Sequence, residues 1–202
     1  SITLAIQATV SITYLLMNNI LYNYGGEVSV TAYAIVGRMM MFSLFPVYGI
    51  TQGFLPIAGY NFGAKNFERV KEVIYLAIKY ASFFATLVFL VLMIFPEEIT
   101  KVFTSDVDVI RETPAAMRWV FLATPIIAIQ LIGAAYFQGI GKAKTGLILA
   151  LLRQGILFVP LILILPLFFG EMGAWISFPI SDFLATIITG IVLIREVKKR
   201  LV

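Results

Sequence analysis

The residue with the clearest chemical potential is Asp182, which lies near the middle of an apolar stretch that runs from Met172 to Ile194. Residues four and seven positions away on either side share its face on an α-helix. They are two aromatic and two hydroxyl side chains: Trp175, Phe178, Thr186 and Thr189. A carboxylate with hydroxyls beside it predicts a cation or proton site made of Asp182, Thr186 and Thr189. The alternative is a structural acid that bonds a neighbouring helix or pairs with Arg38 or Arg153.

Polar side chains also follow one face of the first apolar stretch. Successive members are three or four residues apart, so they fall within a sector of roughly 100° on an α-helix. We call this set the polar stripe; it consists of Thr3, Gln7, Ser11, Tyr14, Asn18 and Tyr22. Lipid does not favour such a face. The stripe therefore forms hydrogen bonds to other helices or lines a cavity, and we favour the cavity.

Two further polar residues are candidates for the same cavity. Arg38 shares a helical face with Phe45, Gly49 and Gln52, so Arg38 and Gln52 are predicted to face inward. We expect Trp175 and Phe178 to face the cavity from the last apolar stretch. Gly49 and Gly53 form a GxxxG pair, as do Gly59 and Gly63, and such pairs allow another helix to approach closely.

The elements that position these side chains are predicted to be membrane-spanning helices. Hydrophobic residues make up 60% of the 202 residues and charged residues only 13%, with a net charge of +4. So few charges cannot cover a water-facing surface. This composition excludes a water-soluble enzyme, a disordered tail and a nucleic-acid-binding protein.

Six apolar stretches reach the about 20 residues that a helix needs to cross a bilayer. They cover residues 2–22, 31–58, 74–95, 118–137, 147–169 and 172–194. Their length, and the absence of two-residue alternation, favour helices over the strands of a barrel. The predicted fold is an all-α integral membrane protein, in which residues 1–202 form a single six-helix bundle.

The distribution of basic residues predicts the orientation in the membrane. With both termini in the cytoplasm, the inner loops and tail carry nine basic residues: Lys65, Arg69, Lys71, Lys142, Lys144, Arg195, Lys198, Lys199 and Arg200. The outer loops then carry three: Lys101, Arg111 and Arg118. Because basic residues favour the cytoplasmic side, we expect a multi-pass protein of the cytoplasmic membrane with cytoplasmic termini.

The chain contains neither Cys nor His. Disulfides, thiolate or imidazole metal sites and Ser-His or Cys-His catalytic pairs are therefore excluded. Paired-acid chemistry needs two carboxylates, and only Asp182 is deeply placed. We expect no enzymatic activity, no cofactor and no metal centre.

Two segments carry a resemblance to a known family. The first covers residues 34–66 and includes Gln52-Gly53-Phe54-Leu55-Pro56 and Gly59-Tyr60-Asn61-Phe62-Gly63. The second is Phe137-Gln138-Gly139-Ile140-Gly141-Lys142, followed by Arg153-Gln154 and Pro160. Both resemble the second half of the multidrug and toxic compound extrusion (MATE) transporters. The resemblance extends along essentially the whole chain, whose six stretches match spans seven to twelve of that twelve-helix fold.

The resemblance implies two six-helix lobes around a central cavity. It implies export of small organic cations by alternating access, driven by H⁺ or Na⁺, and it makes the N-terminal lobe of the same protein the expected partner of this chain. In the NorM-like branch, acids in the seventh and tenth spans help to form the cation site. The matching stretches here have no Asp or Glu in their apolar cores. The chain is therefore more similar to the DinF-like and MepA-like branches, whose important acids lie in the N-terminal lobe.

Two other functions remain open from the sequence. A lipid-linked oligosaccharide flippase of the same superfamily needs a basic cavity, for which Arg38 and Arg153 are available. A non-transporting lobe, either a fragment or a module that pairs with another chain, is the second. The chain begins at Ser1 inside an apolar stretch, so we expect it to be a piece of a longer protein.

Overall fold

The structure is a computed structural model that describes residues 2–200, apart from the side chains of residues 2, 3, 5 and 200. Thr3 of the polar stripe and the basic side chain of Arg200 therefore lie outside the described residues. Of residues 2–200, 92% are helical and none lies in a β-strand. The prediction of an all-helical membrane fold is confirmed.

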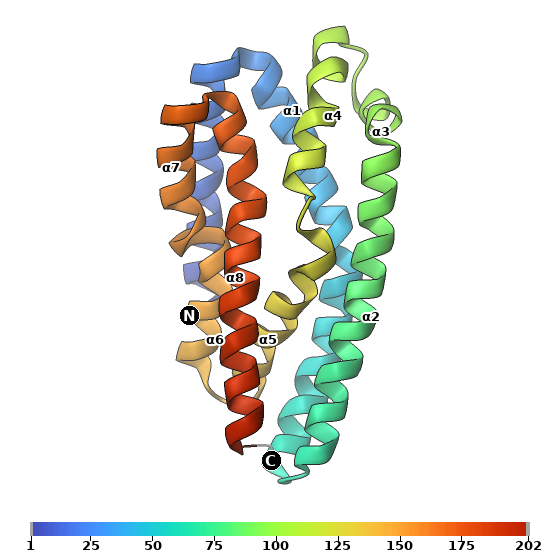
Figure 1. Cartoon of the computed structure of the whole chain (residues 1–202), viewed down its shortest axis with the longest axis vertical. Helices are drawn as coiled ribbons and strands as arrows, with labels where there is room; N and C mark the ends of the chain where they lie inside the picture. The colour runs from blue at the N-terminus through green and yellow to red at the C-terminus, as the bar shows by residue number, and fades with distance from the viewer. Residues whose placement is uncertain (1, 201–202) are drawn as a thin grey trace.

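The first helical element, α1 (Ile2–Gly63), is two helices joined at a sharp turn. Gly26 makes the turn with φ 69° and ψ −155°, a backbone conformation that glycine adopts without steric cost. The part of α1 before Gly26 rises through the molecule and the part after it descends (Figure 1). The predicted stretches 2–22 and 31–58 both lie within α1, one on each side of this turn.

The rest of the chain continues to run up and down the long axis (Figure 1). In order it forms α2 (Phe67–Ile94), α3 (Pro96–Phe103), α4 (Val107–Val120), α5 (Ile127–Gly139), α6 (Ala143–Leu151), α7 (Phe158–Phe169) and α8 (Glu171–Arg200). Five continuous segments are long and apolar enough to cross a membrane, and the first of them, 58 residues long, contains the turn at Gly26. That segment therefore supplies two crossings.

Local sequence explains where several helices begin and end. The side chain of Asn66 accepts a hydrogen bond from the Arg69 backbone N at 3.3 Å and so caps α2. Asp106 caps α4 in the same way, because it accepts from the Asp108 backbone N at 2.9 Å. Gly170, with φ 58°, ends α7 before α8 begins. These residues place the short connections at the two ends of the bundle.

Two of the predicted stretches are interrupted inside the bundle. Residues 118–137 contain a 3₁₀ turn at Thr124–Ile126 between α4 and α5, where Pro125 has no N–H to continue the helix. Residues 147–169 contain a π-helical turn at Leu152–Ile156 between α6 and α7. There the Leu157 N donates to the Leu152 carbonyl at 2.9 Å, five residues earlier rather than four. The π turn changes which faces of this span point inward.

Close helix packing occurs at a subset of the glycines. A Cβ added to Gly59 would stand 2.8 Å from the Gly139 carbonyl oxygen, so α1 and α5 approach there at backbone distance. Gly49, Gly53 and Gly63 have no atom within 4 Å of such a Cβ in the described part of the chain. Of the four GxxxG glycines, Gly59 alone forms a close approach of the predicted kind within residues 2–200.

Candidate functional site

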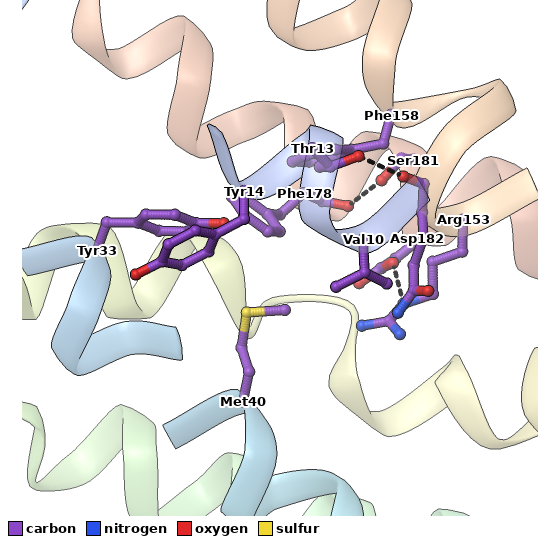
Figure 2. Close-up of a pocket in the computed structure, with 11 residues that line it drawn as sticks. Val10, Thr13, Tyr14, Tyr33, Met40, Arg153, Phe158, Phe178, Ser181 and Asp182 are labelled. Atoms are coloured by element: carbon purple, nitrogen blue, oxygen red, sulfur yellow. Dashed lines mark hydrogen bonds and ion pairs between the residues drawn. The ribbon is translucent and has the colours of Figure 1, made fainter. Parts of the chain in front are cut away.

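A cavity of about 110 Å³ lies between the two parts of α1, the π turn and α8. It is lined by Val10, Thr13, Tyr14, Tyr33, Met40, Arg153, Gln154, Phe158, Phe178, Ser181 and Asp182 (Figure 2). One wall is aromatic and the other is polar. The volume is sufficient for several water molecules or for one small polar group.

Arg153 and Asp182 form a buried ion pair on the polar wall. The Arg153 Nε donates a hydrogen bond to Asp182 Oδ1 at 2.7 Å. The two residues are only 7% and 5% exposed, so each charge depends on the other for compensation. The structure therefore selects Arg153 as the partner of Asp182. Arg38 is exposed and lies over the Phe103 ring, 5.8 Å from its centroid.

The π turn that carries Arg153 is held by side chains from two other elements. A change from four-residue to five-residue hydrogen bonding leaves backbone carbonyls without a helical donor. The Thr13 hydroxyl of α1 donates to the Gln154 carbonyl at 3.0 Å, and Gln130 Nε2 of α5 donates to the Leu149 carbonyl at 2.9 Å. Gly155 lets α1 pack closely, since a Cβ there would stand 2.7 Å from Thr9 Cγ2. The position of Arg153 is thus fixed by contacts with α1, α5 and α8.

The two hydroxyls that were predicted to join Asp182 lie further along α8. Thr186 Oγ1 and Thr189 Oγ1 are buried and have no hydrogen-bond partner among the described residues. A Cβ on Gly133 would stand 2.5 Å from Thr189 Cγ2, so Thr189 packs against α5. Neither threonine lines the cavity. The predicted cation site therefore consists of an acid paired with Arg153 and two buried hydroxyls beyond it.

The aromatic wall contains two predicted residues, Tyr14 of α1 and Phe178 of α8, and two that were not predicted, Tyr33 and Phe158. The Tyr33 ring centroid lies 5.3 Å from that of Tyr14 and 6.3 Å from that of Phe178, and Phe158 lies 4.5 Å from Phe178. Such distances are typical of interacting aromatic rings. Trp175 lies outside the cavity, where its Nε1 donates to Glu171 Oε1 at 3.0 Å.

The remaining polar candidates lie on the surface of the bundle. Gln7, Ser11 and Tyr14 of the polar stripe are exposed. Asn18 is half-buried, and its Nδ2 donates to the Tyr14 carbonyl at 2.9 Å. Arg38 and Gln52 are also exposed. Of the predicted residues, Tyr14, Phe178 and Asp182 are brought together at the cavity.

Thr13, Gln154 and Ser181 line the cavity but were not predicted as cavity residues from the sequence. Thr13 and Ser181 are direct neighbours of the candidates Tyr14 and Asp182, and that adjacency was the available signal. Gln154 is likewise the neighbour of the candidate Arg153, but the direction of its carbonyl depends on the π turn, which the sequence did not predict. The same turn determines the position of Arg153.

The exposed face of the polar stripe leads to a prediction about solvent access. Cysteine placed at Ser11 or at Asn18 in the complete protein, with all other cysteines removed, is expected to react with a water-soluble maleimide, because Ser11 is exposed and Asn18 is only half-buried on the bundle. The matched control is Ser177→Cys on α8, where the side chain is fully buried, and it should be protected. Labelling measured by mass shift checks this. Protection at both Ser11 and Asn18 would show that the stripe is a buried protein interface.

Comparison with known proteins shows which family and which solved structures this chain is similar to. The MatE family model matches residues 3–164. The multidrug export protein MepA of Staphylococcus aureus is 25% identical over 175 residues, which are 87% of this chain and 38% of MepA. The MepA protein of Staphylococcus haemolyticus is 23% identical over 171 residues, which are 85% of this chain and 37% of that protein. The chain therefore spans less than half of the length of these curated relatives.

Solved structures show the same relationship. The MATE multidrug transporter DinF-BH superposes with a TM-score of 0.85 and 38% sequence identity, over 99% of this chain and 44% of DinF-BH. A crystal structure of a MATE protein in a bent conformation has a TM-score of 0.89 and 24% identity, over 96% of this chain and 43% of that one. The fold is thus that of about half of a MATE transporter.

Proposed function

Because this chain belongs to the MATE family, we propose that it is the C-terminal half of an antiporter that exports organic cations by alternating access. The coupling ion is H⁺ or Na⁺. The family match over residues 3–164 is the observation that carries the proposal, and the multidrug export proteins among the relatives support it. The exposed polar stripe on an otherwise apolar bundle is consistent with a face that meets water or protein, since lipid does not favour it.

The partner of this chain in the proposal is the N-terminal lobe of the same protein. The matched chains are more than twice as long as the segment they share with it, because that segment is 38% of MepA and 44% of DinF-BH. A second lobe on the exposed polar face would enclose Tyr14 and Ser11 in a central cavity. Substrates in that cavity would then contact this chain through the polar stripe of α1.

We propose that the protein lies in the cytoplasmic membrane and that both termini of this chain are on the cytoplasmic side. The end of the bundle that holds the α1–α2 and α5–α6 connections carries the basic residues of Lys65–Lys71 and Lys142–Lys144. The other end holds the Gly26 turn and α3, with Glu27, Glu97 and Glu98. This asymmetry supports the proposal through the preference of basic loops for the cytoplasmic side.

A cation or proton at Asp182 competes with Arg153 in this proposal. Because Arg153 already neutralises the carboxylate at 2.7 Å, an incoming cation binds there only when the pair opens. We therefore assign Asp182, with Thr186 and Thr189, to a site that takes up its cation as the Arg153–Asp182 pair separates. The unpartnered hydroxyls of Thr186 and Thr189, one and two helical turns along α8 from Asp182, offer successive oxygen ligands to a cation that moves along this helix.

Export is tested with the complete protein in a bacterial strain that lacks its own efflux pumps. Cells that produce it are expected to accumulate at least about three-fold less rhodamine 123 than cells with an empty vector. An agent that collapses the coupling gradient, a protonophore or a sodium ionophore, should abolish the difference. Equal accumulation in both strains, with the protein present in the membrane, would contradict the proposal. Transport of a lipid-linked sugar instead would favour a flippase.

A further inference from the structure

The outward face of α2 carries a lysine within its apolar part. Helix α2 forms one side of the bundle (Figure 1), and Lys79 is exposed on it. Residues at four-residue spacings from Lys79 share this face. They are large and hydrophobic, with Tyr75 65% exposed, Phe83 57% and Leu87 44%. A single cation therefore lies on a face that is otherwise suited to lipid.

The charge of Lys79 is not compensated by an acid. Helix α2 contains two acids, and both have other partners. Glu68 is paired with Lys71 at 3.0 Å, and Glu72 is paired with Arg69 at 2.6 Å. None of the ion pairs among residues 2–200 involves Lys79. A basic side chain of this kind near a membrane surface attracts anionic lipid.

The depth of Lys79 along α2 matches the boundary between headgroups and acyl chains. It lies seven residues beyond Glu72, the preceding charged residue of the helix, which is about 10 Å along the axis. A lysine side chain at such a depth extends its ammonium group back toward the headgroups. Tyr75 and Tyr80 are both exposed beside it, and tyrosine is enriched at membrane interfaces. The Lys79 ammonium is thus within reach of a lipid phosphate.

A groove of about 550 Å³ adjoins Lys79 on this face. All of its lining residues belong to α2: Lys79, Tyr80, Ser82, Phe83, Phe84 and Thr86. Further along the helix, Leu87 and Leu90 are exposed and apolar. The distance from Lys79 to Leu90 is about 16 Å along the axis, close to half of a roughly 30 Å hydrocarbon core. The face passes from an ammonium group through hydroxyls to apolar side chains, in the order of phosphate, ester and acyl chain in a phospholipid.

We propose that this groove binds an anionic phospholipid, with its phosphate on Lys79 and an acyl chain along Phe83 and Leu87. A zwitterionic lipid is less favourable, because its own cation lies beside the phosphate and repels the lysine. A headgroup without a positive charge, such as that of phosphatidylglycerol, avoids this repulsion. The site is separate from the proposed export function. Only the choice of the cytoplasmic leaflet rests on the orientation proposed above.

The test measures lipid association at this face of the complete protein in a bilayer. A bimane fluorophore is attached to Leu87→Cys, with all other cysteines removed, and the protein is reconstituted into phosphatidylcholine vesicles. A small fraction of phosphatidylglycerol or phosphatidylcholine with a nitroxide on its acyl chain then quenches the fluorophore on contact. We expect phosphatidylglycerol to associate about five-fold more strongly than phosphatidylcholine, the size of one lysine–headgroup attraction. Lys79→Gln should lower this ratio to about one, whereas Lys79→Arg should keep it.

Two controls separate a local site from general attraction between charges. Lys144→Gln removes the same charge from an exposed lysine at the same end of the bundle, and the ratio at Leu87 should persist. A fluorophore on Leu167→Cys, which is exposed on α7, should show no preference for either lipid.

Three results would overturn the proposal. The first is an unchanged ratio in Lys79→Gln. The second is the same loss in Lys144→Gln, or the same preference at Leu167, either of which would show attraction to the protein as a whole. The third is no quenching at Leu87 by either lipid, because another protein segment or a second copy of the chain would then cover this face. No readout depends on transport, so a failure of the proposed export function would leave these results unchanged.

Discussion

Replacing Asp182 by alanine is expected to lower the free energy of unfolding of the complete protein by about 3–5 kcal/mol, because Arg153 would remain buried without a counter-charge. The change is measured by thermal unfolding of the purified protein in detergent.

Asp182→Asn keeps the size of the side chain, and we expect it to lower drug export or to shift the dependence of export on pH or sodium. Unchanged transport at every pH and sodium concentration, with normal expression, would reduce Asp182 to a packing residue.

The control for Asp182 removes both members of the pair. Arg153→Met combined with Asp182→Leu leaves no buried charge, and replacement of a buried pair by apolar residues is often neutral or stabilising. The double variant should therefore recover most of the stability that the single variant loses. A double variant as unstable as Asp182→Ala would show that the loss comes from packing and not from the unpaired charge.

The second large effect is expected at Gly173, where α7 and α8 approach at backbone distance. A Cβ on Gly173 would stand 2.6 Å from the Pro166 backbone N, and the Leu165 carbonyl group is closer still. Backbone atoms cannot move aside as a flexible side chain does, so α8 has to shift. We expect Gly173→Ala to destabilise the protein by about 1–3 kcal/mol or more, measured as a lower midpoint of thermal unfolding.

Gly190 provides the matched control in the same helix. A Cβ there meets only Ile129 Cγ2, at an ordinary 3.8 Å, and alanine favours a helix interior by about 1 kcal/mol over glycine. Gly190→Ala is therefore expected to leave stability unchanged or slightly raised. Equal destabilisation by the two alanines would contradict the account of a tight α7–α8 contact.

Much of the fold could be predicted from the amino-acid sequence, because a helix that crosses a membrane requires only a long apolar run. An apolar run of about 20 residues is visible without any knowledge of packing, and α2 and α8 each contain most of one predicted stretch, although α2 begins seven residues before residue 74. Breaks inside a run are harder to predict. Pro125 coincides with a 3₁₀ turn, but Pro179 lies within an unbroken α8, so proline alone does not locate an interruption.

Sequence spacing predicted which site residues share a face of one helix, but not which residues of different helices come together. Spacing along α8 placed Phe178 and Asp182 on the same face, and both line the cavity. Helical spacing does not say which other helix faces them, so the choice between Arg38 and Arg153 stayed open. The π turn at Leu152–Ile156 also shifts the residues after it away from ideal helical spacing. No residue type in Leu152–Ile156 predicts a π turn.

The most direct test of the account is gradient-driven transport by the complete protein in proteoliposomes. With an imposed proton or sodium gradient of the correct direction, vesicles are expected to move rhodamine 123 across the bilayer at least about five-fold faster than vesicles without a gradient. Asp182→Asn should reduce this difference. Equal dye movement with and without either gradient, in vesicles that contain folded protein, would contradict the account of this chain as one half of a cation-coupled exporter.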